Sequence, residues 1–349
     1  MTRQSIGRIA VLLMILLAVP LVVNAQSLGW KLDADGFFDN SEGDDTYRAT
    51  TTYAGLNLAP QVSLSSKNEH HKIVAGWNAF LELGDKTGFT KGWPIAYYQY
   101  QSSKLRFLFG SMPRTLLYEQ MPDYLVCDSI RYYRPLIMGF DFLFTTKTGH
   151  LEFFLDWTQR RTMQDREQFM AALMTRYHFG MLQIGLDGYY YHYALEKNGL
   201  ELGHHIHDNL VAHPYLGLDL SDKCFMDSLC LRTGVLFQAD RDRADDVWHA
   251  PVGFLGELFA SWHRIFLRQT VYCGGRQQYF GNSGFGEYYW GDTYVQSPWY
   301  SGTRLGYDIF RSSIATVSAQ LAFHVTSAGL NWHQLITLSF ALGGKIKEW

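Results

Sequence analysis

The sequence predicts an all-β protein: a single antiparallel transmembrane β-barrel of about sixteen strands that follows a cleaved signal peptide. Three observations predict this fold. Apolar and polar residues alternate along many segments, and these segments are longer than the strands of soluble proteins. Aromatic residues make up 16% of the chain, whereas charged residues make up only 18%. A barrel in lipid needs an apolar outer band, aromatic girdles and a polar lumen, and this composition supplies them.

The first 25 residues have the organisation of a signal peptide. Arg3 and Arg8 give a positively charged start, residues 9–23 are apolar, and Val23-Asn24-Ala25 fits the small-residue cleavage pattern. Cleavage after Ala25 leaves residues 26–349 as the barrel domain. An uncleaved anchor is the less favoured alternative, because the apolar run is short for a spanning helix. We therefore expect export to the outer membrane of a Gram-negative bacterium.

Alternation with a period of two residues defines the strands. Near the C-terminus, Ile336 and Leu338 alternate with Thr337 and Ser339. Such runs are roughly 10 to 15 residues long, whereas a tilted membrane strand needs about 9–11 residues and soluble strands average about 5–6. The expected strands are residues 27–39, 48–65, 70–84, 91–101, 103–112, 134–147, 149–162, 166–179, 181–195, 208–220, 228–241, 250–263, 264–275, 300–312, 313–326 and 331–345.

The connections support this count. The even-numbered ones are mostly tight turns, and five of the eight odd-numbered ones run to eight residues or more. Outer-membrane barrels have short periplasmic turns and longer outer loops, so both chain ends are expected in the periplasm. Lipid cannot form hydrogen bonds with the backbone groups of an open sheet edge, so the sheet must close into a barrel. Because some neighbouring segments could merge into one strand, the expected number of strands ranges from fourteen to eighteen.

The third long connection, residues 113–133, carries charges of both signs. In sixteen-stranded porins the third outer loop folds into the lumen, and facing charges there set selectivity. We predict that it narrows a pore; a surface cap held by salt bridges is the alternative. The candidate constriction residues are Arg114, Glu119, Asp123, Asp128, Arg131 and Arg134.

Charged residues on the strands are expected to face the lumen, because they are costly against lipid. Acids and bases are nearly balanced, which argues against a phosphate-selective ladder of one sign. Equally, these charges could pair and fill the lumen. The candidate lumen residues are Glu82, Arg106, Asp156, Arg160, Arg176, Arg232, Glu257 and Arg268, together with Asp141, Glu152, Asp187, Asp240, Arg304 and Asp308.

Residues 276–299 are dense in aromatic side chains. Tyr288, Tyr289 and Trp290, with Asp292 nearby, suit stacking on sugar rings. A self-packed plug or girdle is the favoured alternative. The sequence leaves a sugar ligand and a plug as two interpretations of the same segment.

Neither metal nor cofactor is expected. His204, His205 and His207 lie close together in one loop, where a zinc or copper site competes with the favoured interpretation of a solvated polar loop. Cys224 and Cys230 flank a short turn and are placed either to form a disulfide or to stay as thiols. The sequence leaves the pairing of Cys127 and Cys273 open as well.

Sequence motifs of common enzymes do not stand out, so an enzyme is not expected. Ser318 and His324 share one strand face, but six residues of extended chain separate them by about 20 Å. Glu152 and Asp156 are about 13 Å apart by the same reckoning, too far for a glycosidase pair. GxSxG, HExxH and Walker A patterns do not stand out either.

Three segments resemble an uncharacterised group of porin-like outer-membrane proteins of Bacteroidota. They are Phe109-Gly110-Ser111-Met112-Pro113-Arg114, Asp128-Ser129-Ile130-Arg131-Tyr132-Tyr133-Arg134-Pro135 and Gly286-Glu287-Tyr288-Tyr289-Trp290-Gly291-Asp292-Thr293-Tyr294. The resemblance implies an outer-membrane location and supplies no substrate.

The expected function is passive diffusion of small hydrophilic solutes through a lumen narrowed by the third outer loop. A non-conducting barrel that serves as receptor, adhesin or complex partner is the alternative, and a barrel hydrolase is less favoured. Expected partners are outer-membrane lipid and lipopolysaccharide, the barrel-assembly machinery and small solutes. A net charge of −3 does not indicate a protein that binds nucleic acid. Homo-oligomerisation is left open.

Overall fold

The structure, a computed structural model, describes residues 25–44, 46–85, 89–281 and 287–348. In this part of the chain a single antiparallel sheet closes into a barrel, because β1 pairs with both β2 and β17. The strands are β1 (Ala25–Gly43), β2 (Thr51–Ser66), β3 (His71–Glu82), β4 (Phe89–Gln101), β5 (Leu105–Pro113), β6 (Leu136–Thr145), β7 (Gly149–Gln159), β8 (Gln168–Phe179), β9 (Leu182–Tyr193), β10 (His207–Asp219), β11 (Ser228–Asp242), β12 (Val247–His249), β13 (Val252–Trp262), β14 (Ile265–Gly274), β15 (Trp299–Arg311), β16 (Ala315–Thr326) and β17 (Leu330–Glu348).

The prediction of sixteen barrel strands is confirmed. The short β12 and the longer β13 both pair with β11 and together fill one position of the barrel. β12 lies where residues 242–249 were expected to form a loop, which is a small correction. Pro251 separates β12 from β13, because proline has no N–H to donate to the ladder.

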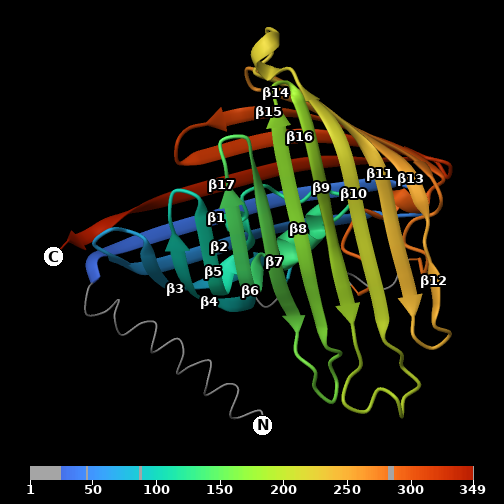
Figure 1. The fold of residues 1–349 in the computed structure, drawn as a ribbon, viewed down its shortest axis with the longest axis horizontal. Coiled ribbons are helices and arrows are strands. Elements are labelled where there is room, and N and C mark those ends of the chain that lie inside the picture. The colour runs from blue at the N-terminus through green and yellow to red at the C-terminus, as the bar shows by residue number, and fades with distance from the viewer. Residues whose placement is uncertain (1–24, 45, 86–88, 282–286, 349) are drawn as a thin grey trace.

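The two ends of the barrel differ. At one end, here called the turn end, short turns join neighbouring strands (Figure 1). The first residues of β1 and the last residues of β17 also lie at this end. The β8–β9 turn is tight enough to need Gly180 at a φ of 64°, a conformation that glycine adopts without strain. The opposite rim, the loop end, carries the longer connections, including the segments after β5 and β14. In outer-membrane barrels such loops face the exterior.

Side chains alternate between lipid and lumen as predicted. On β10, His213 is fully buried in the lumen, whereas Leu216 on the lipid face is 63% exposed. Within the described residues, no helix has the length and apolar character needed to cross a membrane. The apolar side chains of the strands face outward.

Two segments occupy the lumen. The first, the loop-3 segment, comprises residues 114–135 with the 3-10 helix η1 (Arg114–Leu116) and the helix α2 (Asp128–Tyr133). The second, the aromatic segment, comprises residues 287–298 with the 3-10 helix η3 (Thr293–Gln296). Their backbones bind each other, since Cys127 N donates to Trp290 O at 2.8 Å and Asp292 N donates to Asp123 O at 2.9 Å. A third 3-10 helix, η2 (Ser221–Lys223), lies at the turn end.

Candidate functional site

A serine, a histidine and an aspartate form a hydrogen-bonded chain inside the barrel near the loop end. Ser41 Oγ lies 3.2 Å from His333 Nε2, and His333 Nδ1 lies 3.2 Å from Asp39 Oδ1. Ser41 is 1% exposed, and the other two are also buried. This is the order of contacts found in hydrolytic triads, in which a carboxylate orients the histidine and the histidine accepts the serine proton. We call Ser41, His333 and Asp39 the triad.

Barrel closure positions the triad. Ser41 and His333 are direct cross-strand neighbours in the β1–β17 pairing, and Asp39 lies two residues before Ser41 on the same face. Because side chains alternate along a strand, Asp39 and Ser41 both point into the lumen. Paired side chains on one face of two antiparallel strands lie about 5 Å apart, which brings serine and histidine within hydrogen-bond reach.

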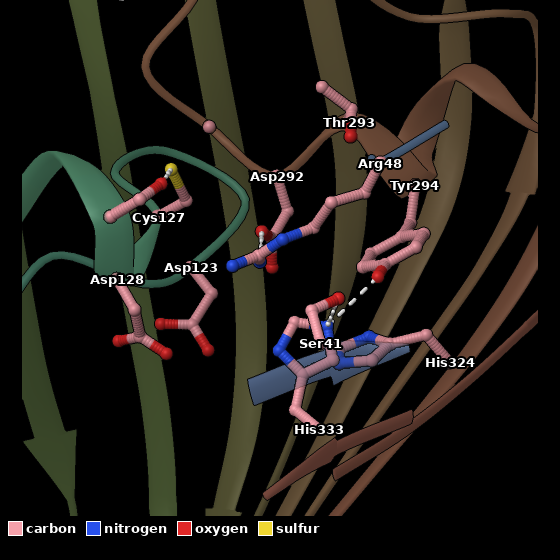
Figure 2. Close-up of polar contacts among 12 residues, drawn as sticks. Ser41, Arg48, Asp123, Cys127, Asp128, Asp292, Thr293, Tyr294, His324 and His333 are labelled. Atoms are coloured by element: carbon pink, nitrogen blue, oxygen red, sulfur yellow. Dashed lines mark hydrogen bonds and ion pairs between the residues drawn. The ribbon is translucent and has the colours of Figure 1, made fainter. Parts of the chain in front are cut away.

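The aromatic segment covers the triad. Tyr294 OH lies 3.1 Å from His333 Nε2, so the Tyr294 and Ser41 hydroxyls both approach the same nitrogen (Figure 2). Tyr294 also stacks on His324 with ring centroids 4.2 Å apart, and His324 in turn binds Tyr300. A hydroxyl donor therefore lies beside the serine, where a developing oxyanion would need one.

Arg48, in the β1–β2 connection, links the triad to the aromatic segment. Its guanidinium lies 3.7 Å from Asp292 (Figure 2). The same guanidinium lies 3.5 Å from Asp39. Burial, together with the neighbouring Asp123, raises the pKa of Asp292 from 3.8 to about 7. Near neutral pH this side chain therefore titrates next to the triad.

Replacement of Asp292 by Asn is expected to change the pH dependence of stability. The folded barrel holds a proton on Asp292 that the unfolded chain releases between pH 4 and 7, so wild-type stability falls as pH rises through that window. The variant should lack this fall, an effect of about 4 kcal/mol. Denaturant unfolding in detergent at pH 4, 5.5, 7 and 8 measures it. Parallel curves for both proteins would contradict the shift.

The predicted constriction residues lie inside the barrel, and their charges are largely paired. Arg131 contacts Asp123 at 2.8 Å and Asp128 at 2.6 Å, and Asp128 also binds Arg304 of β15 at 2.7 Å. Although burial opposes it, Arg304 and Arg131 hold the pKa of Asp128 well below its usual range. On the opposite side of the lumen Arg114 binds Asp156 at 2.5 Å, Glu119 pairs with Arg176, and the Arg134 guanidinium lies over Trp290.

Most predicted lumen residues also face inward. Arg106 binds Asp141 and Glu152, and Glu82 accepts a hydrogen bond from Tyr133 of α2. A cavity of about 380 Å³ in the lumen is lined by Arg176, Arg232, Glu257 and Arg268 among others. Arg160 is the exception: it follows the end of β7 and is exposed, because β7 stops three residues earlier than predicted.

The aromatic segment packs against the protein itself. Trp290 is fully buried, and the guanidinium groups of Arg114 and Arg134 lie 5.4 and 5.2 Å from its ring. Tyr289 is buried and binds Asp240, while Tyr288 stacks on His207 at 4.3 Å. These ring faces already have partners, which favours the plug over a sugar-stacking platform.

The histidine loop and the cysteines show no assembled site. His204 binds Glu196, whereas His207 is buried against Tyr288, so these imidazoles have separate partners. Among the described residues no group of three potential ligands converges on a metal position. All four cysteines are free thiols, which includes Cys224 and Cys230.

Comparison with known protein families identifies the family of this chain. The sequence pattern of the lipid A 3'-O-deacylase-type family matches residues 22–343. The chain belongs to the lipid A 3'-O-deacylase-type family. The family is one of hydrolases, so the expectation of a barrel without enzyme activity is wrong. The expected resemblance to outer-membrane barrel proteins holds in part, and the family is now a named one. No curated protein matches the deacylase-type chain by sequence.

Solved structures with a similar fold include an outer membrane protein and a porin. The outer membrane protein OprD from Pseudomonas aeruginosa has a TM-score of 0.52 and 10% identity, over 91% of this chain and 94% of that one. An anion-selective porin from Comamonas acidovorans has a TM-score of 0.51 and 9% identity, over 90% and 99%. Pseudomonas aeruginosa OccK2 (OpdF) in complex with glucuronate has a TM-score of 0.50 and 11% identity, over 90% and 98%. At these identities the likeness shows the fold of an outer-membrane β-barrel.

Reasoning from the sequence missed the triad. Ser41 lay in residues 40–47, which were assigned to a connection, and Asp39 was the last residue of the first expected strand. β1 in fact continues to Gly43. The usable signal was the closure of the barrel, which pairs the first strand with the last and sets inward residues near Asp39 opposite His333.

Proposed function

We propose that this barrel hydrolyses a fatty acyl ester of a lipid in the outer membrane, with Ser41 as nucleophile. The contact chain Ser41–His333–Asp39 carries the proposal. Membership of the lipid A 3'-O-deacylase-type family supports lipid A as the substrate. An ester of a lipid suits a hydrolase whose outer surface is embedded in that lipid.

The reaction would proceed in two halves. Ser41 Oγ attacks the carbonyl carbon of the ester while His333 Nε2 accepts the serine proton, and the tetrahedral intermediate collapses as His333 returns that proton to the departing alcohol. Water then attacks the acyl-serine while His333 accepts its proton, and His333 returns that proton to Ser41 Oγ as the fatty acid leaves. Asp39 holds the Nδ1–H tautomer of His333 and stabilises its protonated form.

Tyr294 and Arg48 would assist. The Tyr294 hydroxyl shares Nε2 with Ser41, so it is placed to turn toward the oxygen of the tetrahedral intermediate. Arg48 places a positive charge beside Asp39 and the aromatic segment. Entry of the substrate requires the aromatic segment to shift, because Tyr294 covers the serine in this structure.

The lumen contacts disfavour an open channel. The loop-3 segment binds Arg304 of β15 and, through Tyr118 N, Glu152 of β7, so it extends between widely separated strands. The aromatic segment then binds it through two backbone hydrogen bonds. Together these contacts support a filled lumen, and diffusion of solutes is not the function proposed.

Introduction of a side chain at Gly291 is expected to open the lumen. A Cβ there would lie 2.0 Å from Tyr124 O, so Gly291→Val must push the two lumen segments apart. Planar-bilayer recordings should show almost no current steps for the wild type and larger, frequent steps for the variant. Gly36→Ala, where a Cβ meets its nearest atoms at 3.5 Å, should behave as the wild type does. Identical traces for Gly291→Val and wild type would contradict a closed lumen.

The decisive experiment measures acyl loss from lipid A. Purified full-length barrel is incubated with lipid A in mixed micelles, and mass spectrometry follows the loss of one fatty acyl chain. We expect the product with wild type and none above background with Ser41→Ala. Ser318→Ala is the matched control, because Ser318 is also a buried lumen serine but binds Asp308 and no histidine. Wild-type activity in Ser41→Ala would refute the assignment of the nucleophile.

A further inference from the structure

The lipid-facing surface of the barrel carries a second polar cluster, separate from the triad. On β10 the odd-numbered His207 and Asn209 face the lumen, so Asp208 faces outward in line with the exposed Leu210 and Leu216. Asp208 is nevertheless buried, because other side chains of the outer surface cover it. We call this group the outer arginine cluster; its members are Tyr190, His192, Asp208, Arg241 and Arg243.

The Asp208 carboxylate holds two arginines side by side. Arg243 donates from Nε at 2.7 Å and from Nη2 at 3.1 Å, and Arg241 donates from Nη2 at 2.8 Å. Tyr190 OH donates at 2.7 Å, and His192 Nδ1 lies 2.9 Å away. One buried acid thus fixes two guanidinium groups in the plane where the barrel meets lipid.

The two arginines keep surface for a ligand. The Arg243 side chain is 41% exposed. Arg241 lies over the exposed Trp248 ring at 4.5 Å, and its other partner is Asp246 at 2.9 Å. Because Asp246 is 72% exposed, this ion pair is worth little and a stronger anion can replace it.

The surroundings place the cluster at the level of lipid head groups. It lies at the loop end of β9, β10 and β11, directly above the apolar Leu210 and Leu216. Outward aromatic rings lie next to it: Trp157 packs on Phe169, and Phe169 contacts both Tyr190 and His192. Aromatic girdles mark the membrane–water interface, where lipid phosphates also lie.

We propose that the outer arginine cluster binds the phosphate monoester head group of a lipid in the membrane leaflet at the loop end. Two neighbouring guanidinium groups suit a phosphate in charge, and they supply the N–H donors that phosphate oxygens accept. Asp208 acts as a positioning residue, since it binds the arginines and leaves their outer edges for the ligand. The site is independent of Ser41 chemistry, so it would stand even if the proposed hydrolysis were refuted.

The test measures lipid binding without turnover. Full-length Ser41→Ala barrel in detergent is titrated with phosphatidic acid and, separately, with phosphatidylcholine of the same acyl chains, and bound lipid is counted by native mass spectrometry. We expect at least about tenfold tighter binding of phosphatidic acid. Inorganic phosphate at the same concentration should not displace it. Equal affinity for the two lipids, or displacement by inorganic phosphate, would overturn the proposal.

Three further substitutions on this background locate the site. Arg243→Gln should weaken phosphatidic acid binding about tenfold. Asp246→Asn should strengthen it, because a competing carboxylate is removed from Arg241. Arg264→Gln, an exposed arginine at the turn end, should leave it unchanged. Unaltered binding in Arg243→Gln, or weaker binding in Asp246→Asn, would contradict the assignment.

Discussion

Asp39→Asn is expected to lower the turnover number for ester hydrolysis about 10⁴-fold while the barrel still folds. The substitution presents an amide of similar shape, but an amide cannot stabilise the protonated imidazole, and its NH₂ group favours the wrong His333 tautomer. Substrate binding should change little, so the loss should appear in kcat and not in KM. Release of fatty acid from lipid A, measured over a range of substrate concentrations, separates the two constants.

Asp35→Asn is the matched control for that experiment. Asp35 is another lumen aspartate of β1, but it binds Ser339 and makes no contact with the triad histidine. It should retain activity near that of the wild type. His333→Gln should lose more activity than Asp39→Asn, and the double variant should lose little more than His333→Gln alone, because residues of a triad act as a unit. Full activity in Asp39→Asn would show that Asp39 does not orient His333 for catalysis.

Arg106→Ala is expected to destabilise the folded barrel by about 3–5 kcal/mol. Arg106 Nη2 lies 2.8 Å from Asp141 and 2.7 Å from Glu152, and both acids are almost completely buried. Removal of the guanidinium leaves two neighbouring carboxylates inside the lumen without a countercharge. Glu152 also accepts the Tyr118 N–H at 2.9 Å, so the loop-3 segment should loosen as well. Denaturant unfolding in detergent micelles measures the loss.

Two comparisons sharpen this prediction. Lys345→Ala breaks an ion pair with Glu69 in which both partners are exposed, so it should cost no more than about 1 kcal/mol. Arg106→Met combined with Asp141→Asn and Glu152→Gln removes all three charges and should recover part of the stability. If Arg106→Ala unfolded at the same denaturant concentration as the wild type, the ion pairs of Arg106 would not stabilise the folded barrel.

Sequence patterning alone predicts the wall of the barrel. The sixteen expected strands match the structure within a few residues at most ends, because lipid outside and water inside impose the same local rule on every strand. Position in the alternation likewise assigned Arg106, Asp156, Arg232 and Glu257 to the lumen. These inferences need only neighbouring residues. These inferences fail where a strand ends. Arg160 is an example, because β7 ends at Gln159 and the alternation no longer determines which way the next side chain points.

Which lumen side chains contact each other depends on how the strands pair around the closed barrel. Ser41 and His333 are separated by almost the whole chain, and they become neighbours only because β1 pairs with β17 in one register. A shift of that register by two residues would keep every face correct and still separate the serine from the histidine. The loop segments that cover the triad obey no period at all. Local patterning therefore fixes the wall of the barrel, whereas closure and loop packing fix its chemistry.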